Sequence, residues 1–377
     1  MLGKLGRSAV LTMLSAALFA HVAQAQVGEP QLPPSTSSLT NEDRKAITAY
    51  VQHWTDILKN ADKEPKVVEA RGKLMAVFLN YLGSVEHQDY YAREAAAITT
   101  GVLRSAPARL RQLKETNVAI LFAAMQHPGV QNAYEAMVTH PNEAVRYLGW
   151  QGCREIRKQI LGIDRLAARL LASLRKAAAN ENAPIVAEAV FRAMEAPELT
   201  VTPLPPQRLE EIRREFLKIL GEFSLRWCRR VLEGDTAAPT TCQAGVSALR
   251  KSAEVMENDK EARTAILQML ADMLWCSSKA YYDQPAGEVA EANALLLQDI
   301  ELALNVITGL PARPVSKWLN ERGIPEEQKS KEVRLEALKW IVERLKPMGV
   351  KNPEETFAPK PTTEPAPPAE PTTAPKD

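Results

Sequence analysis

Two helix–turn–helix patterns, offset by 41 residues, are the feature that most constrains the fold of this chain. The first pattern predicts helices over 130–137 and 143–160, and the second predicts helices over 164–177 and 184–194. Aligning the second helices gives the pairs Val145/Val186, Gly149/Val190, Gly152/Ala193 and Cys153/Met194. A period near ~40 residues built from such units is typical of an α-solenoid, whose stacked helices usually provide a binding surface.

The second helix of the first unit begins at residues 141–146, with the sequence Pro-Asn-Glu-Ala-Val-Arg. This stretch resembles the HEAT/armadillo-type repeat superfamily, which often places a proline, an Asx residue and Val-Arg there. The resemblance covers residues 130–195, and the second unit departs from it because Ala187 stands where the first has Arg146. It implies a right-handed α-solenoid of HEAT-like helical hairpins used for protein recognition.

The rest of the chain also predicts helices. Apolar residues recur every three to four positions over 47–58 and 209–231, while alternating Val/Ile/Thr runs and Asn-Gly turns are missing. Prolines interrupt the helical pattern between 199 and 206. We therefore expect an all-α fold with repeats over 41–198, a Pro-rich linker over 199–206 and a C-terminal subdomain of longer helices over 207–346.

The N-terminal residues have the features of a secretory signal. Lys4 and Arg7 precede an apolar run, and Ala23-Gln24-Ala25 fits a small-x-small cleavage site. The run is shorter than the ~20 residues that a membrane-spanning helix needs. We predict a signal peptide over 1–25 that is cleaved after Ala25, a linker over 26–40, no transmembrane segment, and export to the periplasm or the extracellular space.

The C-terminal residues differ in composition from the helical part. Nine of the 26 prolines occur from Pro347 onward, together with repeated Thr and Glu. Such a segment has little apolar surface to bury, so we predict a disordered Pro/Thr-rich tail over 347–377. A solvated tail without a partner, a spacer, a glycosylated stretch and a wall-contacting segment remain alternative interpretations.

The charge of the mature chain argues against a nucleic-acid partner. Without Lys4 and Arg7 it holds 45 basic and 46 acidic residues, a net charge of −1. Nucleic-acid binding needs a concentrated basic face. The nearest basic group, Arg104, Arg109, Arg111 and Lys114, is typical of a solvated helix and loop.

The four cysteines of an exported chain suggest a disulfide. Cys228 and Cys242 are equidistant from Asp235 in a predicted helix–helix turn, so they would face each other in an antiparallel hairpin. We expect either a Cys228–Cys242 disulfide or a Cys228 that packs in the core. Cys153 lies on an apolar stripe and is expected to be a buried thiol, and the role of Cys276 stays open.

No motif predicts catalytic, cofactor-binding or metal-binding residues. The mature histidines are scattered at positions 53, 87, 127 and 140, and no nucleophile elbow, phosphate loop or metal-ligand spacing occurs. Trp150 lies one step off the centre of its stripe, so it is a candidate exposed recognition residue, with packing against the next repeat as the alternative. Trp54, Trp227 and Trp340 fall on apolar stripes and are expected in the core.

These observations favour an exported, non-enzymatic helical-repeat scaffold that binds another protein through its stacked second helices. The first alternative is an enzyme with an unrecognised active site in residues 206–345. It would be favoured by carboxylates with strongly shifted pKa values in one deep pocket. The second alternative is a surface- or wall-associated structural protein that uses the Pro/Thr-rich tail.

Overall fold

The computed structural model describes residues 30–34, 38–198, 204–311 and 313–358. In these residues the chain forms fifteen α-helices and no strand, which confirms the predicted all-α class. The helices are α2 (Asn41–Asn60), α3 (Glu64–Asn80), α4 (Val85–Ser105), α5 (Arg111–Met125), α6 (Gln131–Met137), α7 (Glu143–Ile160), α8 (Asp164–Asn180), α9 (Pro184–Ala193), α10 (Pro206–Leu232), α11 (Ala238–Val255), α12 (Lys260–Asp283), α13 (Glu288–Thr308), α14 (Pro314–Asn320), α15 (Glu326–Lys339) and α16 (Pro353–Phe357).

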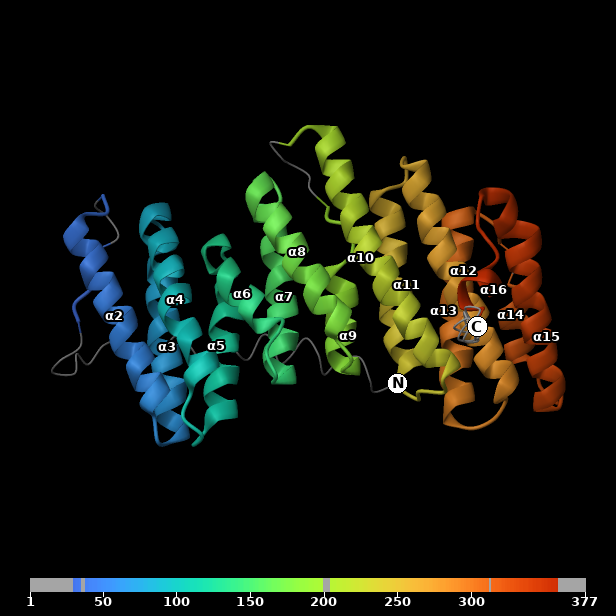
Figure 1. Ribbon diagram of the computed structural model, residues 1–377, viewed down its shortest axis with the longest axis horizontal. Coiled ribbons are helices and arrows are strands. Elements are labelled where there is room, and N and C mark those ends of the chain that lie inside the picture. Colours follow the sequence, from blue (N-terminus) through green and yellow to red (C-terminus); the bar gives the residue numbers. More distant parts are fainter. Residues whose placement is uncertain (1–29, 35–37, 199–203, 312, 359–377) are drawn as a thin grey trace, which may run out of the picture.

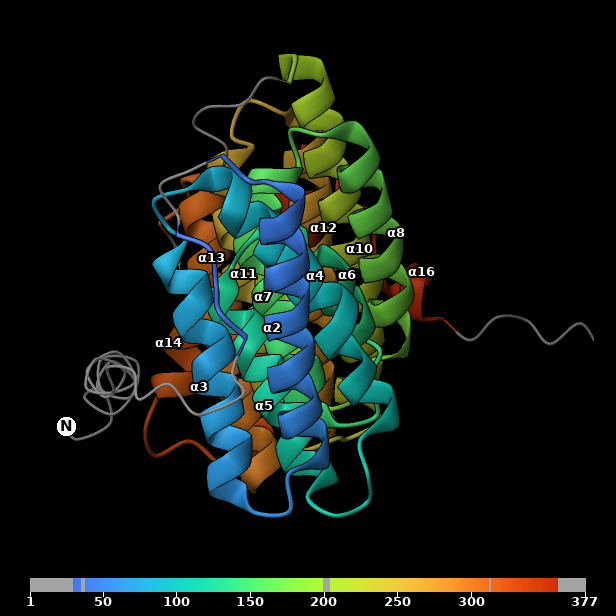
Figure 2. The same ribbon diagram turned by 90° about the vertical axis from the view of Figure 1, so that its left-hand side faces the viewer.

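The helices lie in two layers along the long axis of the molecule, from α2 at one end to α15 at the other (Figure 1; Figure 2). Within each layer, every helix packs against the next one. The first layer contains α2, α4, α6, α8, α10, α12 and α15, and the second layer contains α3, α5, α7, α9, α11, α13 and α14. Each helix therefore packs one face against the other layer, and most helices also contact a neighbour on either side in their own layer.

Four helices lie where the two offset units predict them, namely α6, α7, α8 and α9. The polar breaks define their ends. The Asn142 side chain accepts a hydrogen bond from the backbone N–H of Ala144 at 3.0 Å, which caps α7. At the start of the stack, Thr40 and Asp43 form a capping box at the beginning of α2.

The helices before and after residues 199–203 share one hydrophobic core, and residues 199–203 themselves lie outside the described residues. On either side of this gap, α8 packs against α10 and α9 packs against α11. Buried apolar residues from both halves belong to one hydrophobic cluster. Trp54, Trp227 and Trp340 are at most 2% exposed, which confirms their expected place in the core.

The C-terminal residues return over the helical stack before they leave the described part. Phe357 of α16 stacks on Trp275 of α12 with ring centroids 5.4 Å apart. The backbone N–H of Lys351 donates to the Gln268 Oε1 at 2.7 Å. Residues 347–358 are part of the predicted disordered tail, but in the structure they pack on the stack and include α16. The reason is that the Phe357 ring covers the apolar ring of Trp275.

Several of the predicted segments lie wholly or partly outside the described residues. These are the signal peptide (1–25), residues 26–29 and 35–37 of the 26–40 linker, residues 199–203 of the 199–206 linker, residue 312 of the C-terminal subdomain, and the tail beyond Ala358. Among the described helices, none combines the length and the apolar character that crossing a membrane requires.

Candidate interaction site

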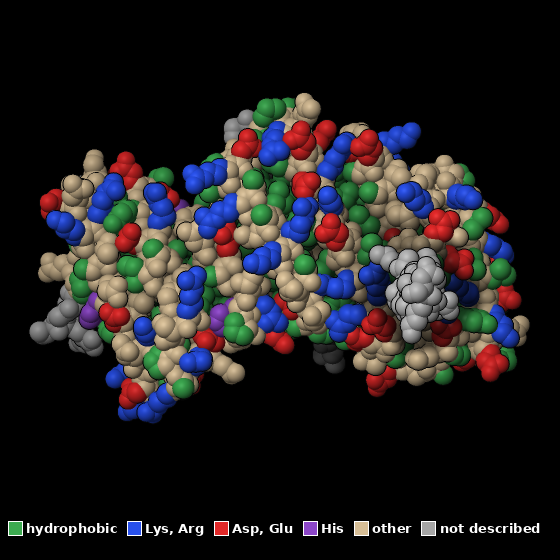
Figure 3. Space-filling view, viewed as in Figure 1, with side chains coloured by type: hydrophobic (Ala, Val, Ile, Leu, Met, Phe, Trp, Pro, Cys, Tyr) green, Lys and Arg blue, Asp and Glu red, His purple; other side chains and the backbone are tan. Residues whose placement is uncertain are grey.

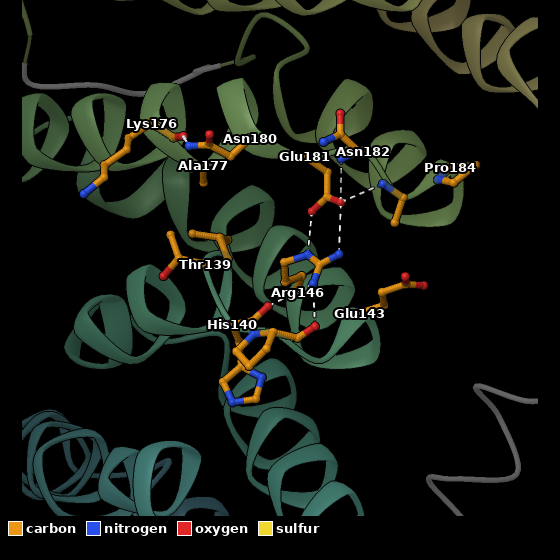
Figure 4. A pocket seen from close by; sticks show the side chains of 13 residues that line it. Thr139, His140, Glu143, Arg146, Lys176, Ala177, Asn180, Glu181, Asn182 and Pro184 are labelled. Atoms are coloured by element: carbon orange, nitrogen blue, oxygen red, sulfur yellow. Dashed lines mark hydrogen bonds and ion pairs between the residues drawn. The ribbon is translucent and has the colours of Figure 1, made fainter. Parts of the chain in front are cut away.

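A hollow of about 760 Å³ lies at the turns of two successive hairpins (Figure 4). These are the turns that follow α6 and α8, the same breaks that separate the predicted helices of each unit. Its lining comprises Val138, Thr139, His140, Pro141, Glu143, Arg146, Lys176, Ala177, Asn180, Glu181, Asn182, Ala183 and Pro184.

An ion pair between Arg146 and Glu181 joins the two hairpins across this hollow (Figure 4). The Arg146 Nε lies 2.7 Å from the Glu181 Oε2, and the Nη2 lies 3.1 Å from the Oε1. The Arg146 Nη1 also donates to the carbonyls of His140 and Pro141. Because the guanidinium spans two turns, it fixes one hairpin relative to the next.

The Glu181 carboxylate accepts hydrogen bonds from its own turn. Besides the ion pair, its Oε1 accepts from the backbone N–H groups of Asn182 and Ala183 at 3.1 and 2.9 Å. The residue is 3% exposed. A buried carboxylate that accepts four hydrogen bonds in this way stabilises a turn.

Two arginines of α10 hold the same turn from the other side. Arg226 donates to the carbonyls of Ala178 and Ala179 at the end of α8, and to the carbonyl of Glu181 at 2.8 Å. Arg230 donates from its Nη1 to the carbonyl of Asn182 at 2.8 Å. These cations satisfy carbonyls that the helix end leaves without a partner.

The rim of the hollow carries the groups that remain accessible. Glu143, Lys176, Asn180 and Asn182 are all exposed there. They offer a carboxylate, an ammonium group and two amides on a concave surface, which suits hydrogen bonding to a polar partner surface. In the described part of the chain, no three His, Cys, Asp or Glu side chains are placed to hold a metal ion.

Trp150 does not contribute to any exposed surface. Its side chain is 0% exposed, so its interpretation as an exposed recognition residue is wrong, and the packing alternative holds. The reason is the position of α7, which packs against α6 on one side and lies between α5 and α9 in its layer.

The possible Cys228–Cys242 disulfide is not present. All four cysteines are free and buried. The turn does bring Cys228 close enough to Cys242 for the two thiols to affect each other's pKa, but α12 adds a third thiol. Cys276 lies 4.3 Å from Cys228, far beyond the ~2.05 Å of a sulfur–sulfur bond.

This thiol cluster has perturbed acidities. Hydrogen bonding to Cys242, and then to Cys276, lowers the pKa of Cys228. The pKa of Cys242 is raised by its hydrogen bond to Cys228 and by burial, and burial raises the pKa of Cys276. Burial also raises the pKa of the neighbouring Asp272 to about 7.

Perturbed groups of this kind often mark active sites. Here Cys228, Cys242 and Cys276 are at most 1% exposed and Asp272 is 4% exposed. None of them lines the hollow at the hairpin turns. The cluster is therefore closed to a substrate in this conformation.

The sequence pattern identified Arg146 but not its partners. Glu181 lies in a polar turn that the pattern marked only as a break, and Arg226 follows 45 residues later on another helix. Arg146 and Glu181 are 35 positions apart, which is somewhat less than the 41-residue offset of the two units. This spacing between an arginine and an acidic residue is the sequence signal that could have predicted the pair. No protein family, curated protein or solved structure matches the chain.

Proposed function

We propose that this chain is an exported, non-enzymatic helical-repeat scaffold that binds another protein. In this proposal its hairpins form a right-handed α-solenoid of HEAT-like repeats, and the Arg146–Glu181 pair couples two of them. The observation that carries the proposal is the hollow at the hairpin turns, which is concave, accessible and lined by two successive hairpins. Repeat architectures typically use such surfaces for recognition.

The state of the polar groups in the hollow supports binding over catalysis. Arg146 and Glu181 both hold turns together through several hydrogen bonds. A general acid or base needs a titratable group within hydrogen-bond reach of the reacting atoms. The accessible Lys176, Asn180 and Asn182 are suited to contacts with a partner.

Apolar surface next to the hollow adds to this support. Ile185 is 54% exposed and directly follows Pro184 of the lining. Ile185 lies on α9, one of the second helices of the repeats. A polar concavity beside an exposed apolar side chain matches the mixed character of non-obligate protein interfaces.

The enzyme alternative has one observation in its favour, the raised pKa of Asp272 in the C-terminal half. A catalytic role would need an opening that brings solvent to this carboxylate, which is 4% exposed. The scaffold proposal requires no such rearrangement.

The proposal is tested by site-specific photo-crosslinking of the full chain in its native compartment. A photoreactive residue replaces Asn182 at the hollow, and a matched one replaces the exposed Lys331 on α15. We expect a protein adduct at position 182, identified by mass spectrometry, and none at 331. Absence of an adduct at both positions contradicts the scaffold function, whereas an adduct at 331 alone contradicts the role of the hollow.

A further inference from the structure

Helices α8 and α10 lie side by side in the first layer and run in the same direction (Figure 1). Near their starts, the Arg208 Nε lies 2.9 Å from the Asp164 Oδ1. Near the end of α8, Arg226 donates to the Ala179 carbonyl. We call the surface between these two helices the α8–α10 groove.

The groove consists of two hollows separated by one ion pair. The Arg175 Nη2 lies 2.7 Å from the Glu215 Oε2, and hollows of about 250 and 360 Å³ lie on either side of this pair. Leu171 and Ile212 line the first hollow, and Ile219 and Phe223 line the second. The floor of the groove is therefore apolar.

The two helices concentrate positive charge. Helix α8 carries four basic residues and one acidic residue, and α10 carries seven basic and four acidic residues. Together they have an excess of six positive charges in a chain whose net charge is +1. Figure 3 shows Lys and Arg side chains over the middle of this face, where α8 and α10 lie, with Asp and Glu side chains among them.

Part of this charge is available to a ligand. Arg229 is exposed, lines the second hollow and has no acidic partner among the described residues. The Arg175 and Glu215 side chains are 41% and 49% exposed. An exposed pair of this kind contributes little to stability, so a ligand carboxylate can replace Glu215 as the partner of Arg175.

We propose that the α8–α10 groove binds an acidic amphipathic helix of the partner protein. This inference rests on the proposed scaffold function and names the class of partner. The apolar side chains of such a helix fill the two hollows, and its carboxylates pair with Arg175 and Arg229. The 17 residues of α8 span about 25 Å, which matches a partner helix of four to five turns.

The same features disfavour a polyanion without apolar groups, such as a nucleic acid. Arg226 and Arg230 already donate to backbone carbonyls of the 178–182 turn. Arg208 pairs with Asp164 and Glu211. Few guanidinium groups remain free for phosphates, and a phosphate backbone leaves the apolar floor uncovered.

The inference is tested by fluorescence anisotropy with the full chain and a labelled 18-residue helical peptide. The peptide carries Leu at every third or fourth position and Glu elsewhere. Two comparison probes are the same peptide with Ser in place of Leu, and a single-stranded DNA of equal charge. The protein variants are R175E/R229E and the control K45E/K331E, which changes the net charge equally at exposed positions of α2 and α15.

We expect R175E/R229E to bind the Leu/Glu peptide about tenfold more weakly than the unmodified chain, and K45E/K331E to bind it nearly as well. We expect the Ser/Glu peptide and the DNA to bind more weakly than the Leu/Glu peptide. R229E alone serves as a second variant if the double variant melts at a lower temperature than its control.

Three outcomes overturn the inference. They are no binding of the Leu/Glu peptide, equal weakening by both double variants, and DNA binding as tight as that of the Leu/Glu peptide. The scaffold function is judged separately, because a crosslinked partner at position 182 that persists in R175E/R229E leaves that function standing while the α8–α10 groove fails.

Discussion

The ring of Tyr134 on α6 lies against Gly152 on α7 so closely that a Cβ on Gly152 would be 2.0 Å from the Tyr134 Cε1. Tyr134 is fully buried, and its hydroxyl donates to the carbonyl of Phe122 at 2.6 Å. The ring therefore cannot move aside without losing a buried hydrogen bond. The absence of a side chain at Gly152 sets the distance between α6 and α7.

We expect Gly152→Ala to lower the free energy of unfolding by about 2–3 kcal/mol, because overpacking outweighs the gain in helix propensity. Urea denaturation followed by circular dichroism measures this change. Gly72→Ala on α3 is the matched control, since no atom lies within 4 Å of a Cβ there. The control should be neutral or more stable, and an equal loss in both variants would contradict the packing argument.

The sequence allowed the helices of the two units to be predicted because each helix end is encoded locally. Asn142 caps α7 and Pro184 begins α9, and both signals lie within a few residues of the boundary. The apolar stripes likewise predicted that Trp54 and Trp227 are buried.

Contacts between hairpins could not be predicted in the same way, because they depend on which helices become neighbours in space. Trp150 lies off the centre of its stripe, yet it is buried because α7 is covered on several sides. The third thiol beside Cys228 and Cys242 comes from Cys276, 34 positions beyond Cys242. The α8–α10 groove could not be predicted from the sequence, because α9 separates its two helices along the chain.

The Arg146–Glu181 pair is expected to stabilise the stack strongly. The Glu181 side chain is 2% exposed, so Arg146→Gln leaves a buried carboxylate without its main partner. We expect a loss of about 3 kcal/mol in the free energy of unfolding. The matched variant Arg175→Gln breaks an exposed pair and should cost at most about 1 kcal/mol. Similar losses in the two variants, measured by urea denaturation, would contradict this assignment.

Asp272 should make stability depend on pH in the range between 3.8 and about 7. Its pKa is higher in the folded chain than in the unfolded chain, so the folded chain retains a proton that the unfolded chain releases. The free energy of unfolding therefore falls as pH rises through this range, by about 4 kcal/mol at most, and levels off above it.

Asp272→Asn removes this contribution while keeping a group that can accept from the Gln268 Nε2. We expect the variant to gain stability relative to the unmodified chain as pH rises from 4.5 to 7.5, as measured by urea denaturation at both values. Equal pH slopes for the two proteins would show that Asp272 does not carry the effect.

The cysteines are expected to remain reduced and unreactive in the folded chain. Each is at most 1% exposed, so a reagent does not reach even Cys228, whose pKa is lowered, and burial raises the pKa of Cys153 well above its usual range. We expect slow reaction of the native protein with a thiol-specific reagent and rapid labelling of four thiols in denaturant. Labelling of only two thiols in denaturant, with Cys228 and Cys242 joined in a peptide map, would instead identify a disulfide.

Phe357 is expected to hold the C-terminal residues on α12. Its ring is parallel to that of Trp275 within 3°, and Trp275 is 6% exposed beneath it. We expect Phe357→Ala to lower the free energy of unfolding by about 1–2 kcal/mol and to shift Trp emission to longer wavelength, because water reaches the indole of Trp275. The neighbouring exposed Thr356→Ala should change neither property. If emission is unchanged in Phe357→Ala, α16 does not cover Trp275 in solution.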